Sequence, residues 1–134
     1  MALRCVIVDD NPGFLEVART LLVHEGLEIV GVASTGADAV DSAAELRPDV
    51  ILLDIDLGAE SGFRVAQWLV DDPDVDPGAL ILISSHAEED LADLIEASPA
   101  IGFLAKPMLS ATAIERLIRT AGGGSDQPGD MLAR

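Results

Sequence analysis

The chain is poor in several residue types on which whole classes of protein depend. Its single cysteine, Cys5, excludes an internal disulfide framework and a multi-cysteine metal site. Eight lysines and arginines stand against 24 aspartates and glutamates, and the net charge of −16 argues against direct binding to nucleic acid, which depends on neutralising phosphates. The longest apolar runs are about half as long as a membrane-spanning helix requires, so we expect no membrane segment.

The composition is that of one folded domain. Apolar residues make up 49% of the 134 residues, enough for a substantial core. We expect the domain to occupy residues 1–121 and the glycine-rich residues 122–134 to form a flexible tail. The start of the chain leads directly into strand-like sequence, which predicts no signal peptide and a cytoplasmic location.

Strand-like and helical patterns alternate five times along the chain. The runs 50–53 and 80–83 are apolar without polar alternation, as parallel strands covered on both faces require. Right-handed crossovers then predict a doubly wound, flavodoxin-like α/β fold, in which a five-stranded parallel sheet of order 2-1-3-4-5 carries helices on both faces. We expect strands near residues 4–9, 28–33, 49–54, 80–84 and 101–105, and helices over 13–25, 36–47, 62–71, 88–97 and 110–121.

Carboxylates end two of the predicted strands. Asp9 and Asp10 end the first strand, and Asp54 ends the third. These strands are neighbours in the predicted order, so three carboxylates converge at the sheet edge where ligands bind. Such a group repels itself unless a hard cation lies among its oxygens, which favours a site for Mg²⁺ (or Mn²⁺).

Two other strand ends supply a hydroxyl and an ammonium group. Ser84 and Ser85 end the fourth strand, and Lys106, the only lysine in the chain, follows the fifth. A carboxylate nucleophile, a cation held by its neighbours, and lysine and hydroxyl donors for phosphoryl oxygens are the parts of a phosphoryl-transfer site. The set is complete for this chemistry.

The chain resembles the receiver domain of two-component response regulators, in the stand-alone form used in chemotaxis. The resemblance covers residues 3–121 and consists of matching residue types, in order and on the expected elements. The matching residues are the acidic pair Asp9-Asp10, the strand-ending Asp54, Gly62 eight residues later, Ser84, Phe103 and Lys106-Pro107.

The resemblance implies a role for each acidic residue. Asp54 would accept a phosphoryl group from a phosphohistidine on a sensor histidine kinase or phosphotransfer protein. Asp10 and Asp54 would bind Mg²⁺ directly, together with the backbone carbonyl of Asp56, and Asp9 would act through water. Asp56 and His86 also occupy positions that tune the lifetime of the phosphate in this family.

The resemblance further implies a conformational switch. Lys106 would pair with the phosphoryl group, and a cis bond to Pro107 would hold the adjoining peptide in place. Ser84 would move to hydrogen-bond the phosphate, and Phe103 would swing inward to fill the vacated space. The face formed by the fourth helix, fifth strand and fifth helix would then change shape for a downstream protein target, and the sequence leaves open whether phosphorylation drives homodimerisation.

Other interpretations compete with this one. Asp54-Ile55-Asp56 resembles the nucleophile motif of haloacid-dehalogenase-like phosphatases, but that family places its acidic pair after the lysine. A receiver-like binding module that works without phosphorylation would not need the complete set of acid, hydroxyl and lysine. We therefore expect no enzyme activity beyond the chain's own phosphorylation and dephosphorylation. At single positions, Ser84 or Ser85 could be a turn residue, and Phe103 could serve as core packing.

Overall fold

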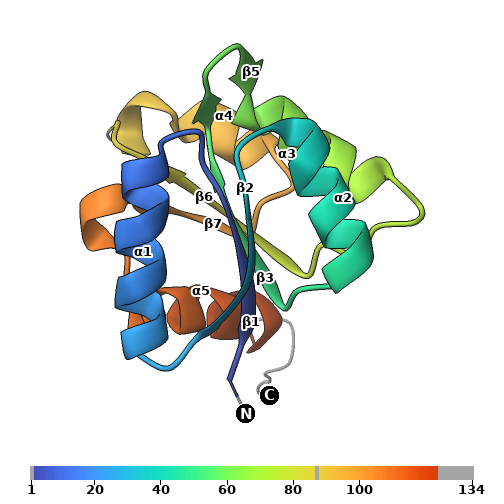
Figure 1. The fold of residues 1–134 in the computed structure, drawn as a ribbon. Coiled ribbons are helices and arrows are strands. Elements are labelled where there is room, and N and C mark those ends of the chain that lie inside the picture. Colours follow the sequence, from blue (N-terminus) through green and yellow to red (C-terminus); the bar gives the residue numbers. More distant parts are fainter. Residues whose placement is uncertain (1, 87, 124–134) are drawn as a thin grey trace.

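Five parallel strands form the central sheet of the computed structural model, which describes residues 2–86 and 88–123. The strands lie in the order β2-β1-β3-β6-β7 (Figure 1), and each neighbouring pair is parallel. They are β1 (Arg4–Val8), β2 (Glu28–Ala33), β3 (Val50–Asp54), β6 (Ala79–Ser84) and β7 (Gly102–Ala105). Counted along the chain, these five strands have the order 2-1-3-4-5, and the predicted fold is confirmed.

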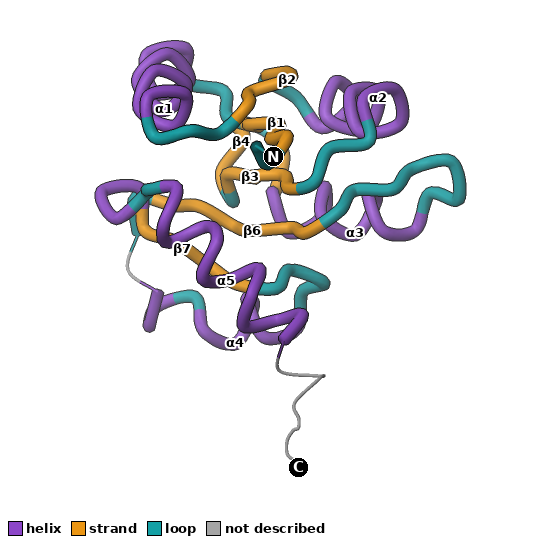
Figure 2. Tube along the Cα trace, turned by 90° about the horizontal axis from the view of Figure 1, so that it is seen from below, coloured by secondary structure: helices purple, strands orange, loops and turns teal. Residues whose placement is uncertain are grey.

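Helices cover both faces of this sheet, as Figure 2 shows. One face carries α1 (Pro12–His24) and α5 (Ala111–Gly123). The other carries α2 (Gly36–Leu46), α3 (Gly62–Asp71) and α4 (Ala92–Ala97). Among the described helices, none combines the length and hydropathy needed to cross a bilayer.

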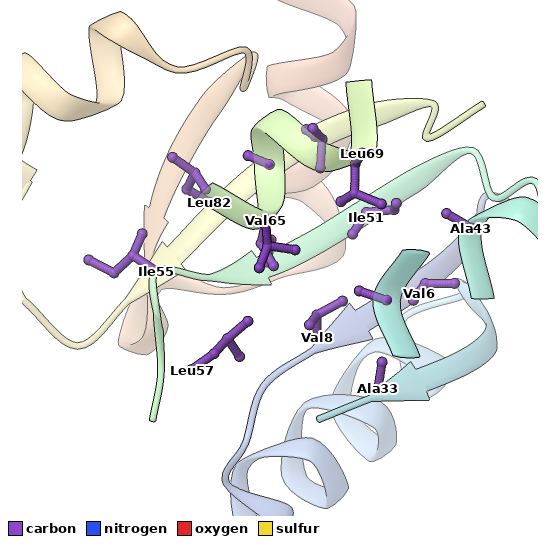
Figure 3. Close-up of a cluster of buried hydrophobic side chains, with 14 of the residues drawn as sticks. Val6, Val8, Ala33, Ala43, Ile51, Ile55, Leu57, Val65, Leu69 and Leu82 are labelled. Atoms are coloured by element: carbon purple, nitrogen blue, oxygen red, sulfur yellow. The ribbon is translucent and has the colours of Figure 1, made fainter. Parts of the chain in front are cut away.

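Alternate residues of each central strand enter two separate cores. Val8 and Leu53 face α2 and α3, in the core that Figure 3 shows, whereas Ile7 and Leu52 face α1 and α5. All four side chains are fully buried. Successive residues of a strand point to opposite faces. A sheet covered on both sides therefore leaves no position for a polar residue, and this explains the uninterrupted apolar runs.

The structure differs from the predicted elements at three places. A hairpin of β4 (Asp56–Leu57) and β5 (Glu60–Ser61) follows Asp54 and was not predicted, because two-residue strands have no periodicity to detect. Residues 88–97 are divided into a 3₁₀ turn, η1 (Glu88–Asp90), and the shorter α4. Helix α5 continues to Gly123, past the predicted end at 121, and residues 124–134 of the predicted tail lie outside the described residues.

Gly62 fixes the path of the chain behind Asp54. It is the first residue of α3, and its N–H donates to the carbonyl of Ile55 at 2.8 Å. A Cβ at this position would overlap the backbone carbonyl of Asp54 and the Cα of Ile55. Backbone cannot rotate away as a flexible side chain would, so only glycine fits here without moving the strand end.

We therefore expect Gly62→Ala to lower the free energy of unfolding by roughly 1–3 kcal/mol, the usual cost of overpacking a closely packed site. Urea unfolding followed by circular dichroism measures it. Gly13→Ala is the matched control, because a Cβ there would meet only the side-chain Oδ1 of Asn11, at 3.3 Å. Equal stability of the two variants would contradict the steric role of Gly62.

Candidate functional site

Three carboxylates converge at the carboxyl ends of β1 and β3. Asp9 and Asp10 follow β1, and Asp54 is the last residue of β3. Because these strands pair in parallel with Val8 opposite Leu53, their ends lie side by side. One oxygen from each carboxylate lies within 4.8 Å of the other two. Asp9 and Asp54 are buried and Asp10 is exposed, so the group is open to solvent on one side only.

Lys106 supplies the positive charge of this site. It follows β7, two strands away from β3, and its long side chain reaches back over the sheet edge. Its Nζ lies 2.8 Å from Asp9 Oδ2 and 3.3 Å from Asp54 Oδ2. The same ammonium lies 4.4 Å from the centre of the Phe14 ring, a cation–π contact that the sequence did not indicate.

Backbone N–H groups hold the two buried carboxylates in position. The N–H of Asn11 donates to Asp9 Oδ1 at 2.9 Å, and the N–H of Asp56 donates to Asp54 Oδ1 at 3.1 Å. In both cases the donor lies two residues after the aspartate, the usual pattern of an Asx turn. Each carboxylate thus has one oxygen fixed by its own loop and the other directed toward Lys106.

Burial and the neighbouring charges shift the pKa of both ionisable partners. Loss of solvent raises the pKa of Asp54 to about 6, and the charge of Asp9 adds to this, while the hydrogen bond from Asp56 and the charge of Lys106 oppose it. For Lys106, burial by itself would lower the pKa. The close contact with Asp9 and the negative charge of Asp54 together outweigh that effect and raise it. The ammonium is therefore charged at neutral pH, whereas Asp54 holds its proton more tightly than an ordinary aspartate.

The donor set fits a hard divalent cation. Three carboxylates and one ammonium leave an excess of negative charge, and the oxygens lie close enough together to share one ion. Within the described part of the chain, Asp9 Oδ2 is buried and lacks a well-aligned hydrogen-bond donor, so only the charge of Lys106 compensates it. Asp9, Asp10 and Asp54 are therefore the residues that could hold Mg²⁺ or Mn²⁺, because oxygen ligands with water are what these ions prefer.

The other predicted residues lie at or just after the neighbouring strand ends, or in the core. Ser84 is buried at the end of β6, next to β3, and its Oγ accepts a hydrogen bond from the N–H of His86 at 2.9 Å. Ser85 and His86 are exposed, which supports Ser84 as the hydroxyl of the site. Asp56 is exposed at the start of β4. Phe103 is buried, with 8% of its surface exposed, and packs in the core beside α3 and α4, so it serves as core packing in this structure.

One prediction about the site is wrong. The peptide between Lys106 and Pro107 is trans, and no peptide bond among the described residues is cis. Pro107 lies instead in the 3₁₀ turn η2 (Lys106–Met108), whose first carbonyl accepts from the N–H of Leu109 at 3.2 Å. A trans proline with its fixed φ fits such a turn, and trans is the ordinary preference of this bond.

Comparison with known proteins identifies the family of this arrangement. Residues 5–119 match the model of the response regulator receiver domain. The polar-differentiation response regulator DivK of Brucella anthropi is 31% identical over 86% of this chain and 89% of its own length. Protein-glutamate methylesterase/protein-glutamine glutaminase 5 of Myxococcus xanthus is 36% identical over 90% of this chain, which spans only 34% of that protein.

A solved structure agrees with these sequence matches. The signal receiver domain of NarL from Mycobacterium tuberculosis superposes with a TM-score of 0.76 at 28% identity, covering 91% of this chain and 98% of that domain. The matches run from β1 into α5, and so include every residue brought together at the sheet edge. The protein therefore belongs to the response regulator receiver domains, the phosphoacceptor switches of two-component signalling.

Proposed function

We propose that Asp54 is the residue of this switch that accepts the phosphoryl group, in a reaction that depends on Mg²⁺. The observation that supports it is the position of Asp54 between the positive ammonium of Lys106 and the neighbouring negative carboxylates. One of its oxygens accepts a hydrogen bond from the N–H of Asp56, and the other faces Lys106. Its carboxylate also lies in the acidic cluster with that of Asp10. Asp9 makes the same kinds of contact, with the N–H of Asn11 and with Lys106, but its side chain has no exposed surface, whereas 6% of the Asp54 side chain is exposed. Of the two carboxylates paired with the lysine, Asp54 is therefore the one that a phosphoryl donor can reach.

The chemistry is a single displacement at phosphorus. A carboxylate oxygen of Asp54 attacks the phosphorus of a phosphohistidine, the new P–O bond forms as the P–N bond breaks, and the imidazole leaves with the electron pair and takes up a proton. The product is an acyl phosphate on Asp54. A bound Mg²⁺ would supply positive charge for the phosphoryl oxygens, held by Asp10, Asp54 and the carbonyl of Asp56, with Asp9 acting through water.

Lys106 and Ser84 are the donors for the new phosphate. The ammonium of Lys106 already contacts the acceptor carboxylate, so it needs little movement to pair with a phosphoryl oxygen. The Oγ of Ser84 accepts from His86, which leaves its own proton free to donate to the phosphate. Movement of Ser84, with adjustment of Phe103, would alter the face of α4, β7 and α5 and present it to a downstream protein.

The remaining assignments concern the residues that tune the phosphate lifetime, the phosphoryl donor and the alternative function. Asp56 and His86 are exposed and follow the ends of the paired strands β3 and β6, where they would control the access of water and hence the lifetime of the phosphate. The donor would be a sensor histidine kinase or a phosphotransfer protein of the cytoplasm. The phosphatase alternative is not favoured, because the acidic pair precedes Asp54 in the sequence and follows the end of the neighbouring strand.

Incubation with acetyl phosphate and Mg²⁺ should add the mass of one phosphoryl group, as seen by intact-mass spectrometry. Asp54→Asn should abolish the adduct, because it removes the nucleophile. Asp56→Asn is the control: it keeps the acceptor and its backbone donor, so the adduct should form, with a changed lifetime. An adduct of unchanged yield in Asp54→Asn would assign the acceptor elsewhere.

Mg²⁺ should stabilise the folded protein by relieving repulsion among the carboxylates. At ten times its Kd the ion would add about 1.4 kcal/mol to the free energy of unfolding. Thermal unfolding with and without Mg²⁺ at constant ionic strength measures this, and Asp10→Asn should remove most of the shift. Asp74→Asn, in the exposed loop after α3, should leave it intact. An unchanged melting temperature in the unaltered chain would count against the cation site.

The raised pKa of Asp54 predicts a pH-dependent gain in stability for Asp54→Asn. The pKa is about 6 in the folded chain and has an ordinary value of 3.8, so ionisation of Asp54 disfavours the folded state. That cost is absent below about pH 3.8, grows up to pH 6 and is fully present above it. Without Mg²⁺ at pH 7.5 the variant should therefore be more stable by roughly 1–3 kcal/mol.

Urea unfolding of both proteins in EDTA, from pH 4 to pH 7.5, measures this difference. The gain should shrink toward pH 4, where Asp54 is protonated in the folded wild-type chain. A variant that is less stable than the wild type at pH 7.5 would show that burial of this carboxylate carries no such cost.

A further inference from the structure

A carboxylate outside the acidic group joins the β4–β5 hairpin to helix α2. Glu60 lies in β5, and its Oε1 accepts a hydrogen bond from the N–H of Gly36 at 2.8 Å, across 24 residues of sequence. Gly36 is the first residue of α2, where N–H groups have no partner within the helix and the helix dipole favours negative charge. Thr35 satisfies the N–H of Asp38 in the same turn, so Glu60 provides a second cap from another element.

The contact is closely packed as well as hydrogen-bonded. A Cβ on Gly36 would come within 3.0 Å of Glu60 Oε2, 3.0 Å of Trp68 Cζ3 and 2.8 Å of Val65 Cγ2. The carboxylate of Glu60 therefore rests on the bare Cα of a glycine, beside two side chains of α3. This junction holds β5, α2 and α3 together at one point.

The other end of the same hairpin borders the carboxylates. In the hairpin, Asp56 pairs with Ser61 and Leu57 pairs with Glu60. The turn passes through Gly58 with φ of +66°, and a Cβ there would lie 3.1 Å from Asp10 Oδ2. The hairpin thus carries the Asp56 carbonyl and places its turn against the Asp10 carboxylate.

Two residue pairs cannot hold a hairpin by themselves, because even longer isolated hairpins are only marginally stable in water. The two ends of this one are held by the bonds from Asp56 to Asp54 and from Gly62 to Ile55, and its middle is anchored by Leu57, which is buried in the core, and by the bond from Gly36 to Glu60. Leu57 fixes the depth of the hairpin, whereas Glu60 ties its second strand to α2. The position of the hairpin relative to Asp10 therefore depends on Glu60.

We propose that Glu60 is a positioning residue for the divalent cation: through its bond to Gly36 it holds the hairpin so that the Asp56 carbonyl and Asp10 face the same point. Glu60 does not touch the cation itself. This inference rests on the cation site proposed above, and it identifies what sets the affinity of that site.

The test compares the Kd for Mg²⁺ in the wild-type chain, Glu60→Ala and Glu60→Gln by isothermal titration calorimetry. Glu60→Ala removes the acceptor and should weaken Mg²⁺ binding about tenfold, at the lower end of effects for residues that orient a metal ligand. Glu60→Gln loses the charge but keeps an oxygen that can accept from Gly36, so its Kd should stay within about twofold of wild type. Circular dichroism checks that each protein is folded.

Each other result would overturn the proposal. Equal weakening in both variants would show that Glu60 acts only by its charge. A lower melting temperature without Mg²⁺ and an unchanged Kd in Glu60→Ala would show a purely structural cap. If the wild-type chain binds Mg²⁺ and Glu60→Ala matches it, this inference fails and the cation site stands. If the wild-type chain does not bind Mg²⁺, both fail together.

Discussion

The site depends on one ammonium group placed between two buried carboxylates. Lys106 Nζ lies 2.8 Å from an oxygen of Asp9 and 3.3 Å from an oxygen of Asp54. A single positive charge cannot balance two buried negative charges, with the exposed Asp10 close beside them. Removing carboxylates from water is costly unless they are paired and hydrogen-bonded. The pKa of Asp54 near 6 is the consequence, and it marks a site that is poised to take up further positive charge.

The fold prevents this repulsion from being relieved by movement. β1 and β3 are adjacent in the middle of the sheet, and each is clamped between two cores by fully buried side chains on both faces. Gly62 lies directly behind the backbone of Asp54, so the end of β3 cannot retreat. The β4–β5 hairpin, anchored by Glu60 and Leu57, lies against the Asp10 carboxylate and limits movement on that side of the site. Rigid packing thus maintains an arrangement that its charges alone would push apart.

The sequence predicted those features that arise from local pattern and topology. Buried parallel strands have a distinct apolar signature, and the strand order alone brings Asp9 and Asp54 to neighbouring ends. Contacts made by long side chains between distant elements have no such signature. Nothing in the sequence near Glu60 indicates that it caps α2. The contact of the Phe14 ring with Lys106 depends on how α1 is positioned relative to the end of β7, which the sequence pattern does not give. The peptide bond before Pro107 is trans, contrary to the expectation from the family, and no local pattern in the sequence distinguishes the two isomers.

The charge balance of the site explains why phosphorylation of Asp54 would change the molecule around it. Esterification turns the Asp54 carboxylate into a neutral acyl group and moves the negative charge outward, onto phosphoryl oxygens that carry about −1.5 to −2. Lys106 contacts both Asp9 and Asp54, so a phosphoryl group on Asp54 would compete with Asp9 for the same ammonium. Lys106 is the only lysine in the chain, so no other ammonium can take its place at Asp9 if it follows the phosphate. A switch of this kind needs no new fold: moving one charge a short distance redistributes the only strong attraction in the site, and the strand ends that carry its donors must adjust.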